Sequence, residues 1–393
     1  MGHINHFRPE VILLLDCART CLDPQRAKRI KSLVATGINW TYFLSLARAH
    51  AVLPLLYRTL NSTCPDTLPK ETLEELRNRF YANAGRNLFL AKELLKIVQL
   101  LEVHGIPSIA YKGPLLAAVV YGNLAFREFG DLDILVREQD HLRARRLLCA
   151  NHYGLTKEFD WESTLVHDSG NFALDLHKRM TAREFSCPLN FEHLSRGLQC
   201  TNVAGAVVST LSPENTLLML AIQITKDCGS RYFQLAKICD MAELLRAYPE
   251  IDLAHVLGQA RRLGVKRMLL FSLCLTNNLL GTVLSQDILS EMQLSPAIDR
   301  LVEYARRQLF DGGGRTPADR KTIDQFRRLV RERLRDKLYP YYLRYVINVI
   351  VPCELERRLL PLPKELSFLY YLIRPARLLA KHGLLQMRRV MPS

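Results

Sequence analysis

Apolar residues recur at helical spacing between residues 40 and 60, which predicts short helices there. A longer amphipathic helix is predicted from residue 70 to about residue 104, where Gly105 ends it. Its predicted apolar stripe consists of Leu88, Ala91, Leu94, Leu95, Val98 and Leu101. We therefore expect an N-terminal helical region over residues 1–104.

Shorter apolar runs follow, and their alternation is typical of strands. The predicted strands are residues 106–111, a strand with two carboxylates within 127–136, and residues 164–167 and 172–177. Residues 139–151 are predicted to form a helix with arginines on its exposed side. Residues 168–171, Asp-Ser-Gly-Asn, have the composition of a hairpin turn between the last two strands. This order predicts a small mixed-sheet core over residues 105–205.

Helical spacing returns after this core. Ser212 followed by Pro213 is a strong signal for a helix start, and helices are predicted to about Phe310. The Gly-Gly-Gly stretch at 311–317 predicts a linker. The predicted fold class is therefore α+β: the mixed-sheet core lies between the N-terminal helical region and a C-terminal helical domain at 206–311, and a basic helical tail follows at 312–393.

Positive charge is concentrated in that tail. The formal net charge is +15, and residues 320–393 contain 17 basic and 6 acidic residues. This excess predicts an anionic partner, which is a membrane surface, a nucleic acid or an acidic protein. Two apolar and aromatic stretches, 339–351 and 368–374, either lie at a membrane interface or pack as helices on the helical domain.

Cysteine spacing and hydropathy exclude two other classes. The ten cysteines contain no Cys-x-x-Cys pair, which argues against a zinc site. We find no secretory signal and no run of about 18 apolar residues that would cross a membrane. We therefore expect a cytoplasmic protein, with peripheral membrane contact through the basic tail as an open alternative.

Two carboxylates on one predicted strand carry the main chemical signal. Asp131 and Asp133 are two residues apart, so they share a face of the strand. Like charges held this close favour a bound cation, and oxygen ligands suit Mg²⁺ (or Mn²⁺) beside substrate phosphates. Upstream, the Lys112-Gly113 turn opens a helix whose backbone N–H groups are available to a phosphate. Together these features indicate chemistry on a nucleoside triphosphate.

A third acid, Asp175, lies between two leucines on a later predicted strand. Three convergent carboxylates would hold one or two metal ions and orient an acceptor hydroxyl. In that arrangement Asp131 and Asp133 carry the metal, and Asp175 completes the site or helps to accept the proton of the acceptor.

These residues resemble the polymerase-β-like nucleotidyltransferase superfamily, with its glycine turn, its Asp-x-Asp strand and a third acid on a later strand. The chain is most similar to an uncharacterised bacterial nucleotidyltransferase family with a Lys-Gly turn, an Arg-x-x-Gly-Asp-x-Asp-x-x-Val strand and a downstream Asp-Leu-His. Here these motifs are Lys112-Gly113, Arg127 to Val136, and Asp175-Leu176-His177. Pro114 departs from the superfamily, because the second turn residue is usually Ser or Gly and proline has no N–H to offer a phosphate.

Four further residues have two readings each. Arg127 either reaches the triphosphate or forms a structural ion pair with a site acid. His177 shares the face of Asp175 and either contacts the base or acceptor or is a half-buried structural histidine. The resemblance implies that Lys226 and Asp240 position nucleotide or acceptor, and the alternative is a solvated or paired surface charge.

The sequence thus predicts an enzyme of the nucleotidyltransferase class that moves a nucleoside monophosphate from an NTP to an acceptor and releases pyrophosphate. The acceptor is open between a small molecule, a peptide, a saccharide and RNA. Two alternatives remain: a glycosyltransferase that uses Asp-x-Asp to bind a nucleotide sugar, and a non-catalytic protein that binds an anionic partner or a membrane surface.

Overall fold

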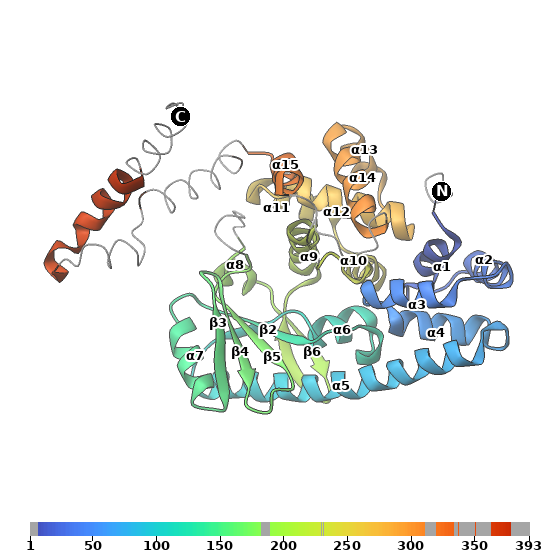
Figure 1. Cartoon of the computed structure of the whole chain (residues 1–393), viewed down its shortest axis with the longest axis horizontal. Helices are drawn as coiled ribbons and strands as arrows, with labels where there is room; N and C mark the ends of the chain where they lie inside the picture. The colour runs from blue at the N-terminus through green and yellow to red at the C-terminus, as the bar shows by residue number, and fades with distance from the viewer. Residues whose placement is uncertain are drawn as a thin grey trace, which may run out of the picture. The chain divides into compact units, whose positions relative to one another are not determined.

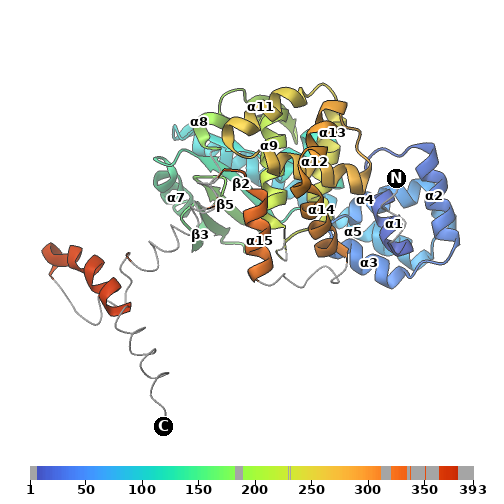
Figure 2. The same cartoon turned by 90° about the horizontal axis from the view of Figure 1, so that it is seen from above.

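The structure is a computed structural model that describes residues 7–181, 189–228, 230, 232–310, 320–333, 337, 350 and 363–378. The described chain forms two compact units, one that runs through residue 332 and one that begins at residue 333. Figures 1 and 2 show the first unit, in which one sheet lies against a long helix and a group of helices covers the other side. The linker predicted at 311–317 lies outside the described residues, and the predicted domain boundaries stay predictions.

The N-terminal region is helical, as the spacing of its apolar residues predicts. Its helices are α1 (Pro9–Cys17), α2 (Pro24–Ala35), α3 (Trp40–Ala49), α4 (Leu53–Thr63), the short 3₁₀ turn η1 (Pro65–Thr67) and α5 (Lys70–Val103). Asp23 and Asn39 cap α2 and α3 by accepting backbone N–H groups. One part of the stripe predicted for α5 is wrong: Leu88 is 44% exposed, and Leu90 is buried instead.

The first unit contains a five-stranded mixed sheet, which confirms the predicted fold class. Its strands are β1 (Ser108–Ala110), β2 (Asp131–Val136), β3 (Tyr153–Glu158), β4 (Glu162–His167) and β5 (Ala173–His177), in the order β1-β2-β5-β4-β3. Only the β2–β5 pair is parallel. The sequence analysis did not find β3, because five of its six residues are exposed and leave no apolar alternation to read.

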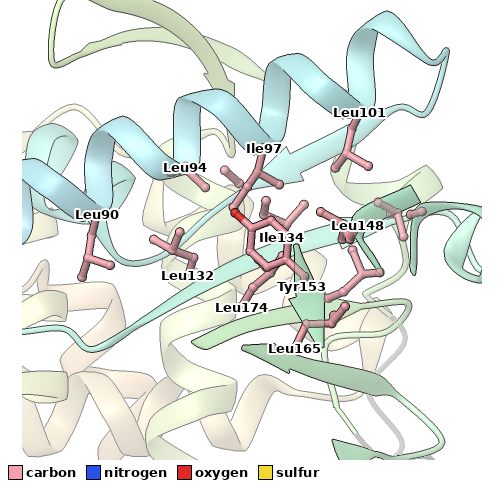
Figure 3. Packing of buried hydrophobic residues seen from close by; sticks show 14 of the residues in the cluster. Leu90, Leu94, Ile97, Leu101, Leu132, Ile134, Leu148, Tyr153, Leu165 and Leu174 are labelled. Carbon is pink, nitrogen blue, oxygen red and sulfur yellow. The ribbon is translucent and has the colours of Figure 1, made fainter. Parts of the chain in front are cut away.

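Three short helices connect the strands of this core, namely α6 (Pro114–Tyr121), the 3₁₀ turn η2 (Leu124–Phe126) and α7 (His141–Cys149). The central strands bury one face against α5 and α7. Leu132 and Ile134 of β2 and Leu174 of β5 are fully buried there, with Leu94 and Ile97 of α5 opposite them (Figure 3). Since side chains alternate along a strand, the intervening residues Asp133 and Asp175 point to the other face. The hydrophobic core therefore decides which face carries the acids.

The chain beyond the sheet contains a hairpin and the predicted helices. The elements are α8 (Phe191–Leu194), β6 (Gln199–Val203), β7 (Ala206–Thr210), α9 (Pro213–Asp227), α10 (Leu235–Ala247), α11 (Leu253–Leu263), α12 (Lys266–Leu280), α13 (Gln286–Gln293), α14 (Pro296–Phe310) and α15 (Arg320–Val330). Ser212 caps α9 and Pro213 occupies its first turn, as the sequence predicts. The hairpin of β6 and β7 was not predicted. It lies against β1, where Thr210 donates to the Ala110 carbonyl.

The second unit is described mainly by residues 363–378, which begin with the 3₁₀ turn η4 (Lys364–Leu369) and continue as a helix. Phe368 is 60% and Leu372 is 67% exposed. The apolar stretch predicted at 339–351 lies outside the described residues, apart from Ile350. Within the described ranges, no helix combines the length and apolarity needed to cross a membrane.

Candidate active site

The predicted acids meet at the centre of the sheet, where β2 and β5 run side by side in parallel. Asp133 lies directly opposite Asp175 in the register of this pair, and Asp131 lies opposite Ala173. His177 is two residues beyond Asp175 and so faces the same side. Asp133 and His177 are buried, at 5% and 4% exposure. The parallel pairing therefore brings together residues that are more than forty positions apart in the chain.

Three of these side chains are close enough to share one metal ion. Ligand atoms of Asp133, Asp175 and His177 all lie within 4.8 Å of one another. His177 Nε2 lies 3.0 Å from Asp133 Oδ1, and its Nδ1 lies 3.2 Å from Glu162 Oε2. The predicted metal acids Asp133 and Asp175 are thus brought together, and the histidine predicted to contact nucleotide lies between two carboxylates.

Strand β4 supplies two residues that the sequence analysis did not identify. Glu162 lies opposite His177, and Thr164 lies opposite Asp175. Burial raises the pKa of Asp175, and a hydrogen bond with Thr164 opposes this effect. The alternation of β4 around the buried Leu165 was the available signal, because it places residues 162 and 164 on the same face as the acids.

One carboxylate oxygen of this cluster lacks a hydrogen bond. Asp175 Oδ1 is buried and has no hydrogen-bond partner within the described part of the chain. A buried carboxylate oxygen without a partner is costly unless something else satisfies it. Together with the neighbouring Asp133 carboxylate, it provides hard oxygen ligands that fit a divalent cation.

Asp131 begins β2 and is exposed, outside the group of three. The charge of Asp133, followed by partial desolvation, raises the pKa of Asp131, whereas Lys112 and Arg127 act in the opposite direction. Asp131 is therefore close enough to Asp133 for their charges to interact. Its exposed carboxylate extends the acidic surface toward solvent.

The Lys112-Gly113 turn lies directly beside these acids. Gly113 has φ +51°, a backbone conformation that other residues rarely adopt. A Cβ atom here would also approach the Asp131 carbonyl oxygen to 3.3 Å, so both the backbone and the available space favour glycine. Lys112 Nζ donates to Asp133 Oδ1 at 2.7 Å. Burial alone would raise the pKa of Asp133, but the charge of Lys112 and the contact with His177 hold it below its usual value. The turn thus supplies the positive charge that compensates the buried carboxylate.

Arg127 is paired with Asp240 of α10. Its Nε and Nη2 donate to the two Asp240 carboxylate oxygens at 2.8 and 3.0 Å, and Tyr121 Oη donates to Oδ1 at 2.7 Å. Asp240 is 1% exposed. Asn87 donates to the Arg127 carbonyl, which fixes this segment to α5 as well. Arg127 and Asp240 are therefore brought together as a buried ion pair that joins the sheet to the helical domain.

Lys226 lies in the last turn of α9, with Nζ 3.9 Å from Asp227 Oδ1. Burial lowers its pKa, Asp227 opposes this effect, and the charges of Lys112 and Lys237 lower it further. Lys226 therefore lies beside Asp227, and its role toward nucleotide or acceptor stays a prediction.

Comparison with known proteins agrees with this geometry. A family model described as "Uncharacterised nucleotidyltransferase" matches residues 36–281, which include every residue of the cluster. No curated protein matches the chain significantly.

Several solved structures show a weaker likeness. The antibiotic-resistance factor ANT(2'')-Ia is 14% identical, with 44% of this chain and 92% of that chain covered and a TM-score of 0.33. A nucleotidyltransferase-like antigenic protein from Paracoccidioides brasiliensis is 16% identical, with 46% and 91% covered and a TM-score of 0.29. A tRNA-processing enzyme is 13% identical, with 76% and 92% covered and a TM-score of 0.24. The assignment therefore depends on the family model.

Proposed function

The chain belongs to the family of uncharacterised nucleotidyltransferases, and we propose that it is a Mg²⁺- or Mn²⁺-dependent enzyme that moves a nucleoside monophosphate from an NTP to an acceptor and releases pyrophosphate. One observation carries the proposal. Asp133 and Asp175 face each other on parallel strands, beside Asp131 and next to a lysine-glycine turn that opens a helix.

The acids are proposed to hold the metal. Asp131, Asp133 and Asp175 offer carboxylate oxygens on one face, and the unpartnered Oδ1 of Asp175 is available for a ligand. A divalent cation bound there would neutralise charge on the triphosphate and on the departing pyrophosphate. His177 is proposed to hold the Asp133 carboxylate in place through its Nε2 contact, because a hydrogen-bonded carboxylate keeps its orientation.

The basic residues around the acids are proposed to bind the phosphates. Lys112 donates to Asp133, and Lys226 at the end of α9 is proposed to supply a second positive charge. Gly113 allows the backbone to approach closely before α6, although Pro114 removes one N–H donor from that turn. Asp175 is proposed to complete the metal site or to help accept the proton of the attacking hydroxyl, since its Oδ1 has no hydrogen-bond partner among the described residues.

For Arg127 and Asp240 we propose a positioning role in place of direct contact with nucleotide. Asp240 is buried and Arg127 is largely buried, and each is satisfied by the other, so neither extends toward a ligand. Asn83 and Asn87 of α5 also hold the Arg127 carbonyl. The pair would fix the start of β2, and therefore Asp131, relative to α5 and α10.

Pyrophosphate release tests the proposed function. The purified full chain is incubated with each of the four NTPs and with Mg²⁺, Mn²⁺ or EDTA, while label from α-³²P-NTP is followed into small-molecule, protein and RNA fractions of a lysate. We expect metal-dependent pyrophosphate release and a labelled acceptor. Asp175→Asn should lose this activity, whereas Asp168→Asn, in the exposed β4–β5 turn, should keep it. Release of nucleoside diphosphate or phosphate instead of pyrophosphate would contradict the proposal.

The basic tail supports a further part of the proposal, peripheral contact with an anionic membrane. Residues 320–393 contain 17 basic and 6 acidic residues, and the helix at 363–378 exposes Phe368, Tyr371 and Leu372. Exposed apolar side chains within a basic segment are typical of helices that lie in a membrane interface. Sedimentation with vesicles should show binding to phosphatidylserine-containing membranes and none to neutral ones. A Phe368→Ser/Leu372→Ser variant that sediments like the natural chain would contradict this contact.

A further inference from the structure

A second feature lies where β2 leaves the sheet. Strands β2 and β5 run parallel, so their carboxyl ends, at Val136 and His177, lie at the same edge. In open sheets with parallel strands, ligands bind outside the carboxyl ends of the strands. Arg137 directly follows Val136 there. Helix α8 lies on the side of the sheet away from α5, which is the side that carries the acids (Figure 1).

These segments line a shallow, open cleft of about 370 Å³. It is lined by Arg137, Gln139, Phe191, Glu192, Ser195 and Arg196. The guanidinium carbon of Arg137 lies 5.5 Å from the centre of the Phe191 ring, and Phe191 is itself buried at 5% exposure. The aromatic ring therefore keeps the arginine at the cleft.

The two arginines of the cleft are not neutralised by hydrogen-bonded partners. Across the part of the chain that the structure describes, neither the Arg137 nor the Arg196 side chain makes a hydrogen bond or an ion pair. Contact with a ring face orients a guanidinium without using its N–H donors, which remain available for a planar oxyanion. The cleft contains these two cations against one carboxylate, that of the exposed Glu192.

We propose that this cleft binds an oxyanion group, carboxylate or phosphate, of the acceptor substrate. This inference rests on the proposed function, because it assigns the acceptor of the same site. Arg137 is four positions beyond Asp133 along nearly extended chain, which corresponds to about 13 Å at the strand rise. The acceptor class is therefore a hydroxyl-bearing organic acid or phosphate ester whose oxyanion lies on the order of 10 Å from the attacking oxygen.

Local hydrogen–deuterium exchange tests the cleft directly. The full chain is titrated with inorganic phosphate and, separately, with acetate, in EDTA so that no metal bridges an anion to the acids. We expect saturable protection of peptides covering 137–140 and 189–198. Arg137→Gln/Arg196→Gln should weaken this binding by at least about tenfold, because charged hydrogen bonds are lost. The anion that protects more strongly identifies the group as phosphate or carboxylate.

A matched double variant controls for the change in charge. Arg143→Gln/Arg145→Gln removes two arginines from α7, on the opposite face of the sheet, and should keep the protection. Absence of saturable protection with both anions, or equal protection in the Arg137/Arg196 variant, would overturn the proposal. Pyrophosphate release by the natural chain, measured in parallel, separates the two hypotheses: anion binding without any release would contradict the acceptor role and the proposed function together.

Discussion

The two faces of β2 and β5 consist of alternate residues of the same strands, and they have opposite effects on the stability of the fold. One face buries Leu132, Ile134 and Leu174 against α5, where they contribute to the free energy of folding. The other face holds Asp133 and Asp175, whose close negative charges oppose folding unless they are compensated. Substitutions one position apart should therefore separate stability from activity.

The largest expected effect is on activity, from the acidic face. Asp131→Ala should lower pyrophosphate release by at least about 10³-fold, since the proposed function assigns this carboxylate to the metal that acts on the charge of the transferring group. Asp131 is exposed at the start of its strand, so the melting temperature should hardly change. Full NTP-dependent activity in this variant would contradict the assigned site.

The buried pair behind this face should show its effect in stability. Asp240→Asn leaves the largely buried Arg127 guanidinium without its counter-charge, which should cost about 3–5 kcal/mol of unfolding free energy. A double-mutant cycle of Arg127→Met and Asp240→Leu in urea measures the coupling energy. The control is a cycle on Arg48 and Glu75, a largely exposed pair expected to give about 0–1 kcal/mol. Equal coupling in the two cycles would exclude a special role for the buried pair.

On the apolar face, Leu174→Ala should destabilise the protein by about 2–5 kcal/mol through loss of packing and a residual cavity. The activity of the molecules that remain folded at low temperature should change little. Leu155→Ala, at a position of β3 that is 43% exposed, is the control and should cost far less. Urea unfolding combined with pyrophosphate release tests both expectations. A Leu174 variant that lost activity while keeping its stability would reverse the comparison.

A smaller effect is expected from His50, a buried polar residue outside the sheet. Its Nδ1 accepts the Leu235 N–H, and burial lowers its pKa from 6.5 to about 4. The folded state disfavours the protonated form of His50. The contribution of His50 to the free energy of unfolding is therefore fully present above about pH 6.5 and is lost as pH falls toward 4. The loss should reach about 3 kcal/mol.

Urea unfolding at several pH values measures this dependence. His50→Gln should show a shallower decline than the natural chain over the same interval, because it removes one group that must be protonated on unfolding. His255→Gln, at an exposed site, serves as the control and should follow the natural chain. A decline in the His50 variant as steep as in the natural chain would show that other groups set the pH dependence.

Local patterns predicted most of the architecture. The 3.6-residue spacing of apolar residues predicted α5, and Gly105 predicted its end. The alternation of apolar and polar residues around Asp131 and Asp175 predicted two strands whose acids share one face. Strand β3 was missed because its exposed, polar residues lack that alternation. The site residues of β4, Glu162 and Thr164, depend on strand register, which pairs them with β5 only in the folded sheet.

Long-range pairing was beyond sequence reasoning for a physical reason. Arg127 and Asp240 are both charged residues near the predicted site, and either could have contacted a ligand. Their mutual contact joins residues 113 positions apart and follows from the packing of α10 on α6, which no local pattern encodes. The sequence also did not predict a role for Arg137 and Arg196 beside α8, because basic residues in loops are usually solvated.

The Arg127–Asp240 pair also fastens α10 to the segment that leads into β2. One hydrogen-bond network connects three elements here. In it, Asp240 of α10 accepts from Tyr121 of α6 and from Arg127, which precedes β2. A hinge-like swing of the helical domain away from the sheet at this point would expose two separated charges. We therefore expect α10 and the segment that leads into β2 to move as one body in any rearrangement of the helices around the sheet.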